Sequence, residues 1–173
     1  MLALKITDTR SFMTKLLAQD TFDTFLFSEG SVTTFTTFAI DGTWHPDYFG
    51  ENEQPEPDSG MNGAFRAKQP LTWRMVRPVI YDIIKGRHTP INMRIILKLA
   101  DYNVEHLLAN AGLSLSKEQV DGLFLNLNYG KETVTATTGT SMKVFTLDRS
   151  LDRVWDDMVR RFLETRGILF DEE

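Results

Sequence analysis

The sequence of 173 residues contains no cysteine. It therefore offers no disulfide, no thiol nucleophile and no thiolate ligands for a zinc or iron–sulfur centre. It has no apolar run of the roughly 18–20 residues that cross a bilayer. Its first residues, MLALKITDTRS, lack the charged start, long apolar stretch and small-residue cleavage site of a secretory signal. These absences predict a cytoplasmic protein with no membrane partner.

Histidine is also scarce. His45, His88 and His106 are far apart, and none has the His-x-x-x-His spacing of a helical metal site. The sequence contains no glycine-rich phosphate loop and no dinucleotide-binding motif. Ser141 and Lys143 could form a nucleophile pair on one side of a strand, but exposed strand residues are the commoner explanation. We expect no catalytic residue, no metal and no cofactor. The alternative, which stays open, is a small enzyme or ligand-binding protein whose site is assembled from scattered residues.

Twelve phenylalanines and many threonines favour β-strands, and the length suits a single domain over residues 1–173. Alternating apolar residues predict strands at residues 2–6 and 91–99. After each strand comes an aspartate that can cap a helix, Asp8 or Asp101, and then the apolar face of a short helix. The sequence therefore predicts an α+β fold.

Each of these helices is followed by strand-like runs. A hairpin is expected over residues 24–42, with its turn at Ser28–Ser31, and a short edge strand over 43–49. Further strands are expected at 123–127, 132–138 and 141–147. Two more helices are expected. One covers residues 72–86, where Pro78 either kinks the helix or begins it, and the other covers 149–166, capped by Asp148.

A β-α-β-β-β unit used twice, in residues 2–45 and 91–147, resembles the fold of DNA polymerase sliding clamps. In that family helices line the inside of a ring and sheets form the outside. The resemblance implies duplicated antiparallel units, to which residues 46–90 add an acidic loop and an inserted helix, and residues 148–173 a C-terminal helix and tail. An unrelated α+β arrangement with similar local signals is the alternative. The chain also resembles a small, uncharacterised bacterial family of unknown function.

The sequence departs from the clamps in its charges. Clamps carry lysine and arginine on the helices that face DNA, where the phosphates must be neutralised. Here the first helix offers Arg10 and Lys15, and the second offers Glu105 and His106 instead. The resemblance is therefore taken to imply the fold, without ring formation or processivity, and the oligomeric state stays open.

Charge is unevenly distributed along the chain. Residues 66–98 contain eight basic side chains and one acidic one, a net charge of +7, whereas the whole chain carries −5 and the remainder therefore −12. This segment favours a non-enzymatic protein that binds nucleic acid without sequence preference, or an acidic protein partner. The alternative is that acidic parts of the same chain neutralise it. The candidate binding residues are Arg74, Arg77, Lys85, Arg87, Arg94 and Lys98.

The C-terminal segment GILFDEE places three apolar residues after a helix stop and before three acids. Packing of Ile168 and Phe170 on the protein's own sheet, or on a second copy of the chain, is the expected arrangement. A tail that docks onto a partner protein is the alternative.

Overall fold

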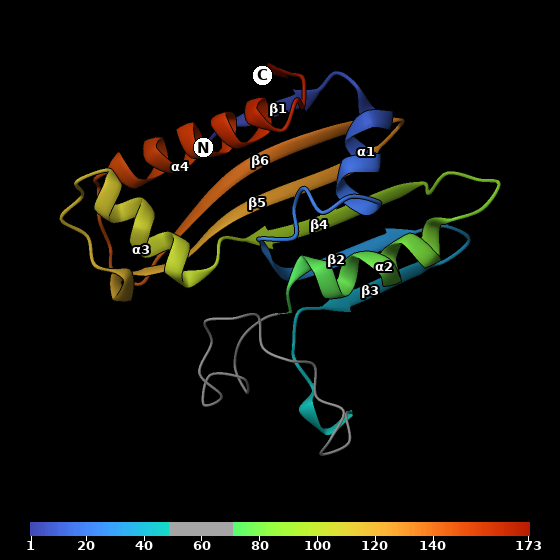
Figure 1. The fold of residues 1–173 in the computed structure, drawn as a ribbon, viewed down its shortest axis with the longest axis horizontal. Helices are drawn as coiled ribbons and strands as arrows, with labels where there is room; N and C mark the ends of the chain where they lie inside the picture. Colours follow the sequence, from blue (N-terminus) through green and yellow to red (C-terminus); the bar gives the residue numbers. More distant parts are fainter. Residues whose placement is uncertain (49–70) are drawn as a thin grey trace.

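One antiparallel sheet contains all seven strands found within residues 1–48 and 71–173, the parts of the chain that the computed structural model describes. The order of the strands is β3-β2-β4-β5-β6-β1-β7, and Figure 1 shows them with the helices that accompany them. The strands are β1 (Ala3–Ile6), β2 (Leu26–Thr33), β3 (Thr37–Asp41), β4 (Asn92–Lys98), β5 (Val120–Gly130), β6 (Thr133–Met142) and β7 (Phe170–Glu172). The sheet confirms the predicted α+β class.

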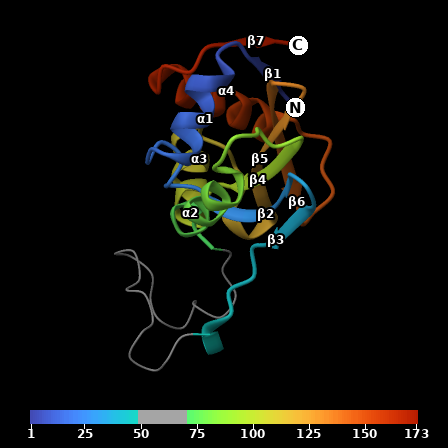
Figure 2. The ribbon, with the colours of Figure 1, turned by 90° about the vertical axis from the view of Figure 1, so that its right-hand side faces the viewer.

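The described residues form four α-helices, and these cover one side of the sheet. Figure 2 shows the helices on one side of the molecule and the strands on the other. The α-helices are α1 (Thr9–Leu17), α2 (Trp73–Ile84), α3 (Asp101–Asn110) and α4 (Ser150–Thr165), and short 3₁₀ turns lie at η1 (Pro46–Tyr48) and η3 (Lys117–Gln119). Residues 1–48 and 71–173 therefore form two layers, and within these ranges no helix lies on the other face of the sheet.

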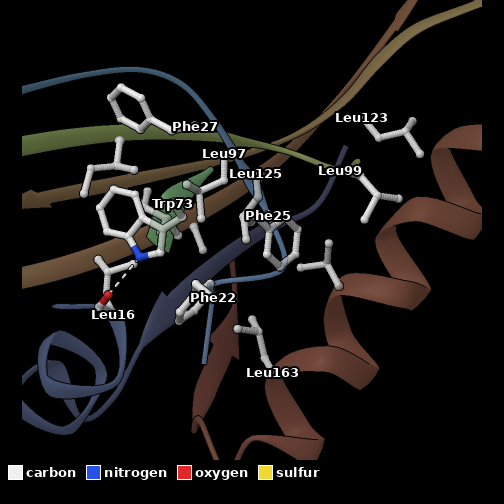
Figure 3. Close-up of a cluster of buried hydrophobic side chains, with 14 of the residues drawn as sticks. Leu16, Phe22, Phe25, Phe27, Trp73, Leu97, Leu99, Leu123, Leu125 and Leu163 are labelled. Carbon is white, nitrogen blue, oxygen red and sulfur yellow. Dashed lines mark hydrogen bonds between the residues drawn. The ribbon is translucent and has the colours of Figure 1, made fainter. Parts of the chain in front are cut away.

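The hydrophobic core lies between the sheet and the helices. Trp73 of α2 is fully buried, and its indole N–H donates to the Leu16 carbonyl at 2.9 Å, which ties α2 to α1. Phe22 and Phe25 pack beside it and meet Leu163 of α4 (Figure 3). On the sheet side of the core, β4 and β5 contribute Leu97 and Leu125, both with no exposed surface. Burying large apolar side chains on both layers provides the main force that holds them together.

Periodicity predicted several elements correctly. Residues 2–6 and 91–99 contain β1 and β4, and the helices expected at 72–86 and 149–166 are α2 and α4. Pro78 lies inside α2, so it does not begin that helix. Asp8 caps α1 as expected, accepting a hydrogen bond from the Ser11 backbone N–H at 2.9 Å.

The other two predicted caps differ in position. Asp101 is the first residue of α3, whose N-cap is Ala100, and its carboxylate pairs with Lys117 at 3.0 Å instead. The N-cap of α4 is Arg149, while Asp148 accepts from the Ser150 backbone N–H at 2.9 Å. In both cases the chain enters the helix one residue away from the predicted position.

The hairpin turn predicted at Ser28–Ser31 is wrong. Strand β2 runs through this stretch, and the connection to β3 lies at residues 34–36. Gly30 pairs with Ile40 on one side and Ile95 on the other. A Cβ at Gly30 would lie 3.0 Å from the Arg94 carbonyl oxygen. A glycine is therefore needed here because the neighbouring strand approaches closely. The sequence alone does not distinguish this role of a glycine from its role in a turn.

Two further predicted strands are also wrong. Strand β6 continues to Met142, where its pairing with β5 ends at Val120, and residues 143–149 leave the sheet. The edge strand expected over 43–49 is replaced by the 3₁₀ turn at Pro46–Tyr48, because proline cannot donate a ladder hydrogen bond. Residue 49 and the predicted acidic loop at 50–63 lie outside the described residues.

The two halves of the chain share an element order but not a pairing pattern. Strand β4 pairs with β5 of its own half, whereas β1 pairs with β6 and β7 and is remote from β2. The C-terminal tail forms β7 against β1, and Ile168 is buried. The tail therefore packs on the protein's own sheet, as expected.

Candidate binding surface on the open face of the sheet

Strand β4 divides its side chains between the two faces of the sheet. Met93, Ile95 and Leu97 are buried beneath the helices. Because side chains alternate along a strand, the other residues of this strand, Arg94, Ile96 and Lys98 among them, project from the helix-free face. We call this helix-free side of the sheet the open face.

The six predicted binding residues do not lie on one surface. Arg74, Arg77 and Lys85 belong to α2 or its end, and Arg87 follows in the loop, all connected with the helical layer. Arg94 and Lys98 lie on the opposite side of the sheet. The dense basic segment of the sequence is thus divided by the sheet itself.

Arg77 is neutralised within the protein. Its guanidinium donates two hydrogen bonds to the Asp23 carboxylate, at 2.9 and 2.8 Å, and a longer one to the Leu17 carbonyl at 3.4 Å. The side chains of Arg77 and Asp23 are 18% and 14% exposed. This arrangement joins α2 to the segment after α1, and the predicted internal neutralisation applies to this residue.

The other three predicted residues of the helical side, Arg74, Lys85 and Arg87, are exposed. Lys85 pairs with Asp82 at 2.8 Å, and this hydrogen bond and the charge of Asp82 raise the pKa of Lys85 above its usual value. Arg74 and Arg87 are exposed, and no ion pair joins either to another residue in the described ranges.

On the open face, Lys98 and Arg94 lie near an aromatic ring and a carboxylate. The ammonium of Lys98 is 6.0 Å from the centroid of the Phe124 ring, within the range of a cation–π contact. Arg94 lies 3.7 Å from Glu29, with both side chains 58% exposed. Such an exposed ion pair contributes little to stability, so Arg94 can exchange it for another anion.

Phe124 is half-buried and lies among glycines. A Cβ at Gly122 would come within 2.6 Å of the Phe124 ring, so the ring lies over the bare backbone there. Gly139 is the direct cross-strand partner of Phe124 on β6. Neither glycine adds a side chain beside the ring, so Phe124 and Ile96 form a small apolar area on a mostly polar face.

An open depression of about 300 Å³ borders this ring. Its wall includes Phe124 and Gly139, Ile96 provides an apolar floor, and Asn126 and Glu29 provide polar groups at the rim. The Asn126 amide donates only a long hydrogen bond, 3.4 Å, to the Thr137 carbonyl. The depression combines an apolar floor with a small number of polar groups, as ligand sites commonly do.

A third cation shares the open face. The strand register aligns Arg94 with Asn128, Thr135 and Lys5 in one row across four strands. Three strand spacings of about 4.8 Å place the backbones of Arg94 and Lys5 roughly 14 Å apart. Glu29, Asp41 and Asp171 occupy the same face, so its total charge is close to balanced.

Phe124 and Lys5 were missed by reasoning from the sequence. A signal for Phe124 does exist, because Leu123, Leu125 and Leu127 mark the buried side of the strand. The residues between them are Phe124, Asn126 and Asn128, and an aromatic residue in a polar row is unusual. Lys5 had no such signal, because its place beside β6 depends on pairing distant in sequence.

The residues considered for other chemistry are scattered. His45, His88 and His106 are exposed, and no group of three or more potential metal ligands comes together within the described residues. Ser141 donates to Asp121 at 2.9 Å. Among the helices of the described ranges, none combines the length and the apolar character needed to cross a membrane.

The chain belongs to DUF5721, a family of unknown function, whose profile matches residues 15–171. This agrees with the expected membership of an uncharacterised family. No curated protein and no solved structure matches the chain. The resemblance to sliding clamps stays a prediction.

Proposed function

We propose that this chain is a non-enzymatic binding protein that contacts nucleic acid through the open face of its sheet. The observation that carries the proposal is the grouping of Lys98, Arg94 and Phe124 on a sheet face that none of the four described helices covers. Cations neutralise phosphates, and aromatic rings stack on bases without regard to sequence. The flat ring favours nucleic acid over an acidic protein, whose carboxylates do not require an aromatic surface.

Binding through this face is weak and depends modestly on salt. Three cations are available, Lys5, Arg94 and Lys98, while nearby carboxylates keep the face close to neutral. Each contact with a phosphate of a single strand contributes about 0.7 to the slope of log affinity against log salt, so three contacts give a slope of about −2. The dissociation constant expected for non-specific binding at physiological salt is on the order of 10⁻⁴–10⁻⁶ M.

The helical side is the competing surface. The clamp resemblance would place nucleic acid against the helices, and the exposed Arg74 and Arg87 lie on that side. Two double variants separate the surfaces because they remove the same charge: Arg94→Ala with Lys98→Ala on the open face, and Arg74→Ala with Arg87→Ala on the helical side.

The test measures fluorescence anisotropy of a labelled oligonucleotide over a series of salt concentrations. The open-face variant should lose affinity, and its slope should fall from about −2 to about −0.7, since one of three contacts remains. The helical-side variant should bind like the unaltered protein. Equal losses in both variants, a loss confined to the helical-side variant, or no binding by the unaltered protein at low salt would each overturn the proposal.

A further inference from the structure

We propose that the depression beside Phe124 holds one unstacked nucleobase, so that the open face selects single-stranded over duplex nucleic acid. This inference rests on the proposed function and identifies the form of nucleic acid that the surface accepts. The depression would bind the base, whereas the cations of the open face would bind the phosphates.

The geometry around Phe124 suits a flat heterocycle. Gly122 and the cross-strand partner Gly139 add no side chain beside the ring, and the neighbour that lies over it is the flexible side chain of Lys98. Ile96, 8% exposed, forms an apolar floor next to it. A base that enters the depression of about 300 Å³ can therefore contact the ring and bury apolar surface together. The depression is wide open to solvent, so a base that lies in it is covered on one side only.

Polar groups at the rim match the edge of a base. The Asn126 side chain offers both a donor and an acceptor, and it is held only by the long bond to Thr137. The Glu29 carboxylate can accept a hydrogen bond from an exocyclic amino group, while its partner Arg94 turns to a phosphate. The Lys98 ammonium, 6.0 Å from the ring centroid, moves aside when a base stacks on the ring and then pairs with the phosphate attached to that base.

A duplex cannot use this depression. Its bases are stacked on one another and paired within the helix, and their flat faces are not available to a side chain on a sheet. Only the phosphates of a duplex would contact the open face. The stacking contribution of an aromatic residue to single-strand binding then corresponds to a preference on the order of 5- to 150-fold.

Two variants test the base site without removing charge. Phe124→Leu keeps an apolar side chain and removes the aromatic face. Gly139→Val fills the depression, and it should fold well because a Cβ at Gly139 would have ordinary contacts of 3.7 Å to Asn126 and 3.9 Å to Phe124. Phe35→Leu is the matched control, because Phe35 is 93% exposed at the turn between β2 and β3.

The experiment compares a labelled oligothymidine single strand with a duplex of equal length, by anisotropy at low salt. The unaltered protein should prefer the single strand by at least about fivefold. Phe124→Leu and Gly139→Val should bring single-strand affinity down to that of the duplex and leave the duplex unchanged. Phe35→Leu should behave like the unaltered protein. Circular dichroism of each variant verifies the fold.

The possible failures are distinguishable. If both forms bind equally and Lys98→Ala weakens both, the proposed function stands and the base site is wrong. If Phe124→Leu and Gly139→Val fold and retain the single-strand preference, the base site is also wrong. No binding to either form overturns the proposed function itself. Competition by free thymidine monophosphate at concentrations equal to the oligonucleotide would overturn the assignment to a strand, and would point to a mononucleotide.

Discussion

The pair formed by Arg77 and Asp23 allows a direct test of internal neutralisation. Two short hydrogen bonds join the guanidinium to the carboxylate, and both side chains are more than four-fifths buried. Arg77→Met keeps the length and packing of the side chain but leaves Asp23 without its cation. Breaking a fully buried pair costs about 3–5 kcal/mol. Because some exposure remains here, we expect a loss of about 2–4 kcal/mol.

Urea unfolding followed by circular dichroism measures this loss, and thermal unfolding should show a decrease in Tm of about 5–15 °C for a chain of this size. The double variant Arg77→Met with Asp23→Leu should recover most of the stability, because no charge is then left unpaired. Nucleic-acid binding should not change in any of these variants. A loss below about 1 kcal/mol, which is the range of exposed pairs, would refute the argument that Arg77 is a structural residue.

Two further predictions concern α4. Trp155 is fully buried, and its indole N–H donates to the Phe124 carbonyl at 3.0 Å. Trp155→Ala should therefore lower the free energy of unfolding, measured by urea titration, by about 3–5 kcal/mol. A variant of unchanged stability would contradict the placement of Trp155 in the core. The hydrogen bonds from Ser150 hold the pKa of Asp148 below its usual value. Asp148 therefore stabilises the folded protein above about pH 4 and this contribution is lost as the pH falls through the lowered pKa. Ser150→Ala removes the hydroxyl hydrogen bond and should raise the pKa of Asp148, which carboxyl NMR titration measures. An unchanged pKa would show that the Ser150 hydroxyl is not a cause.

Local patterns predicted the elements that depend on local physics. The stripe of Leu151, Trp155, Val159 and Leu163 in α4 faces the core, and all four are buried. The alternation from Met93 to Leu97 likewise marks the buried face of β4. In both cases the spacing of the apolar residues matches only one kind of element, a helix for α4 and a strand for β4. The face that carries these apolar residues is then the one expected to be buried.

The errors arise where a residue has two possible structural roles. Gly30 satisfied the requirements of a turn, but its place between two neighbouring strands requires a small side chain for another reason. Strand pairing decided between the roles, and pairing connects residues far apart in the chain. The single sheet of seven strands, with β1 next to β6, could not be predicted from local signals for the same reason.

The candidate site was predicted only in part. The sequence shows which residues carry charge, but it does not show to which side of the sheet each side chain projects. The basic segment was recognised, but its six described members, all except Arg66 and Lys68, occupy both sides of the sheet. Arg77 lies in α2 and therefore on the helical side of the sheet. Arg94 lies in β4, where the alternation of side chains places it on the open face. A helix and a strand that are neighbours in sequence can present their charges to opposite sides, so a dense basic segment is not by itself a surface.

The position of α4 connects the core to the proposed base site. Its Trp155 hydrogen-bonds to the backbone of Phe124 from the buried side of β5. Two residues of α4, Asp156 and Asp152, accept hydrogen bonds from Thr138 and Thr140 of β6, which flank Gly139. Helix α4 therefore contacts both β5 at Phe124 and β6 around Gly139 from the buried side of the sheet, and so fixes the positions of these two residues. A site held by packed elements needs little ordering when it binds. For this reason we expect the proposed binding of nucleic acid to be measurable even on a small open face with three cations and one aromatic ring.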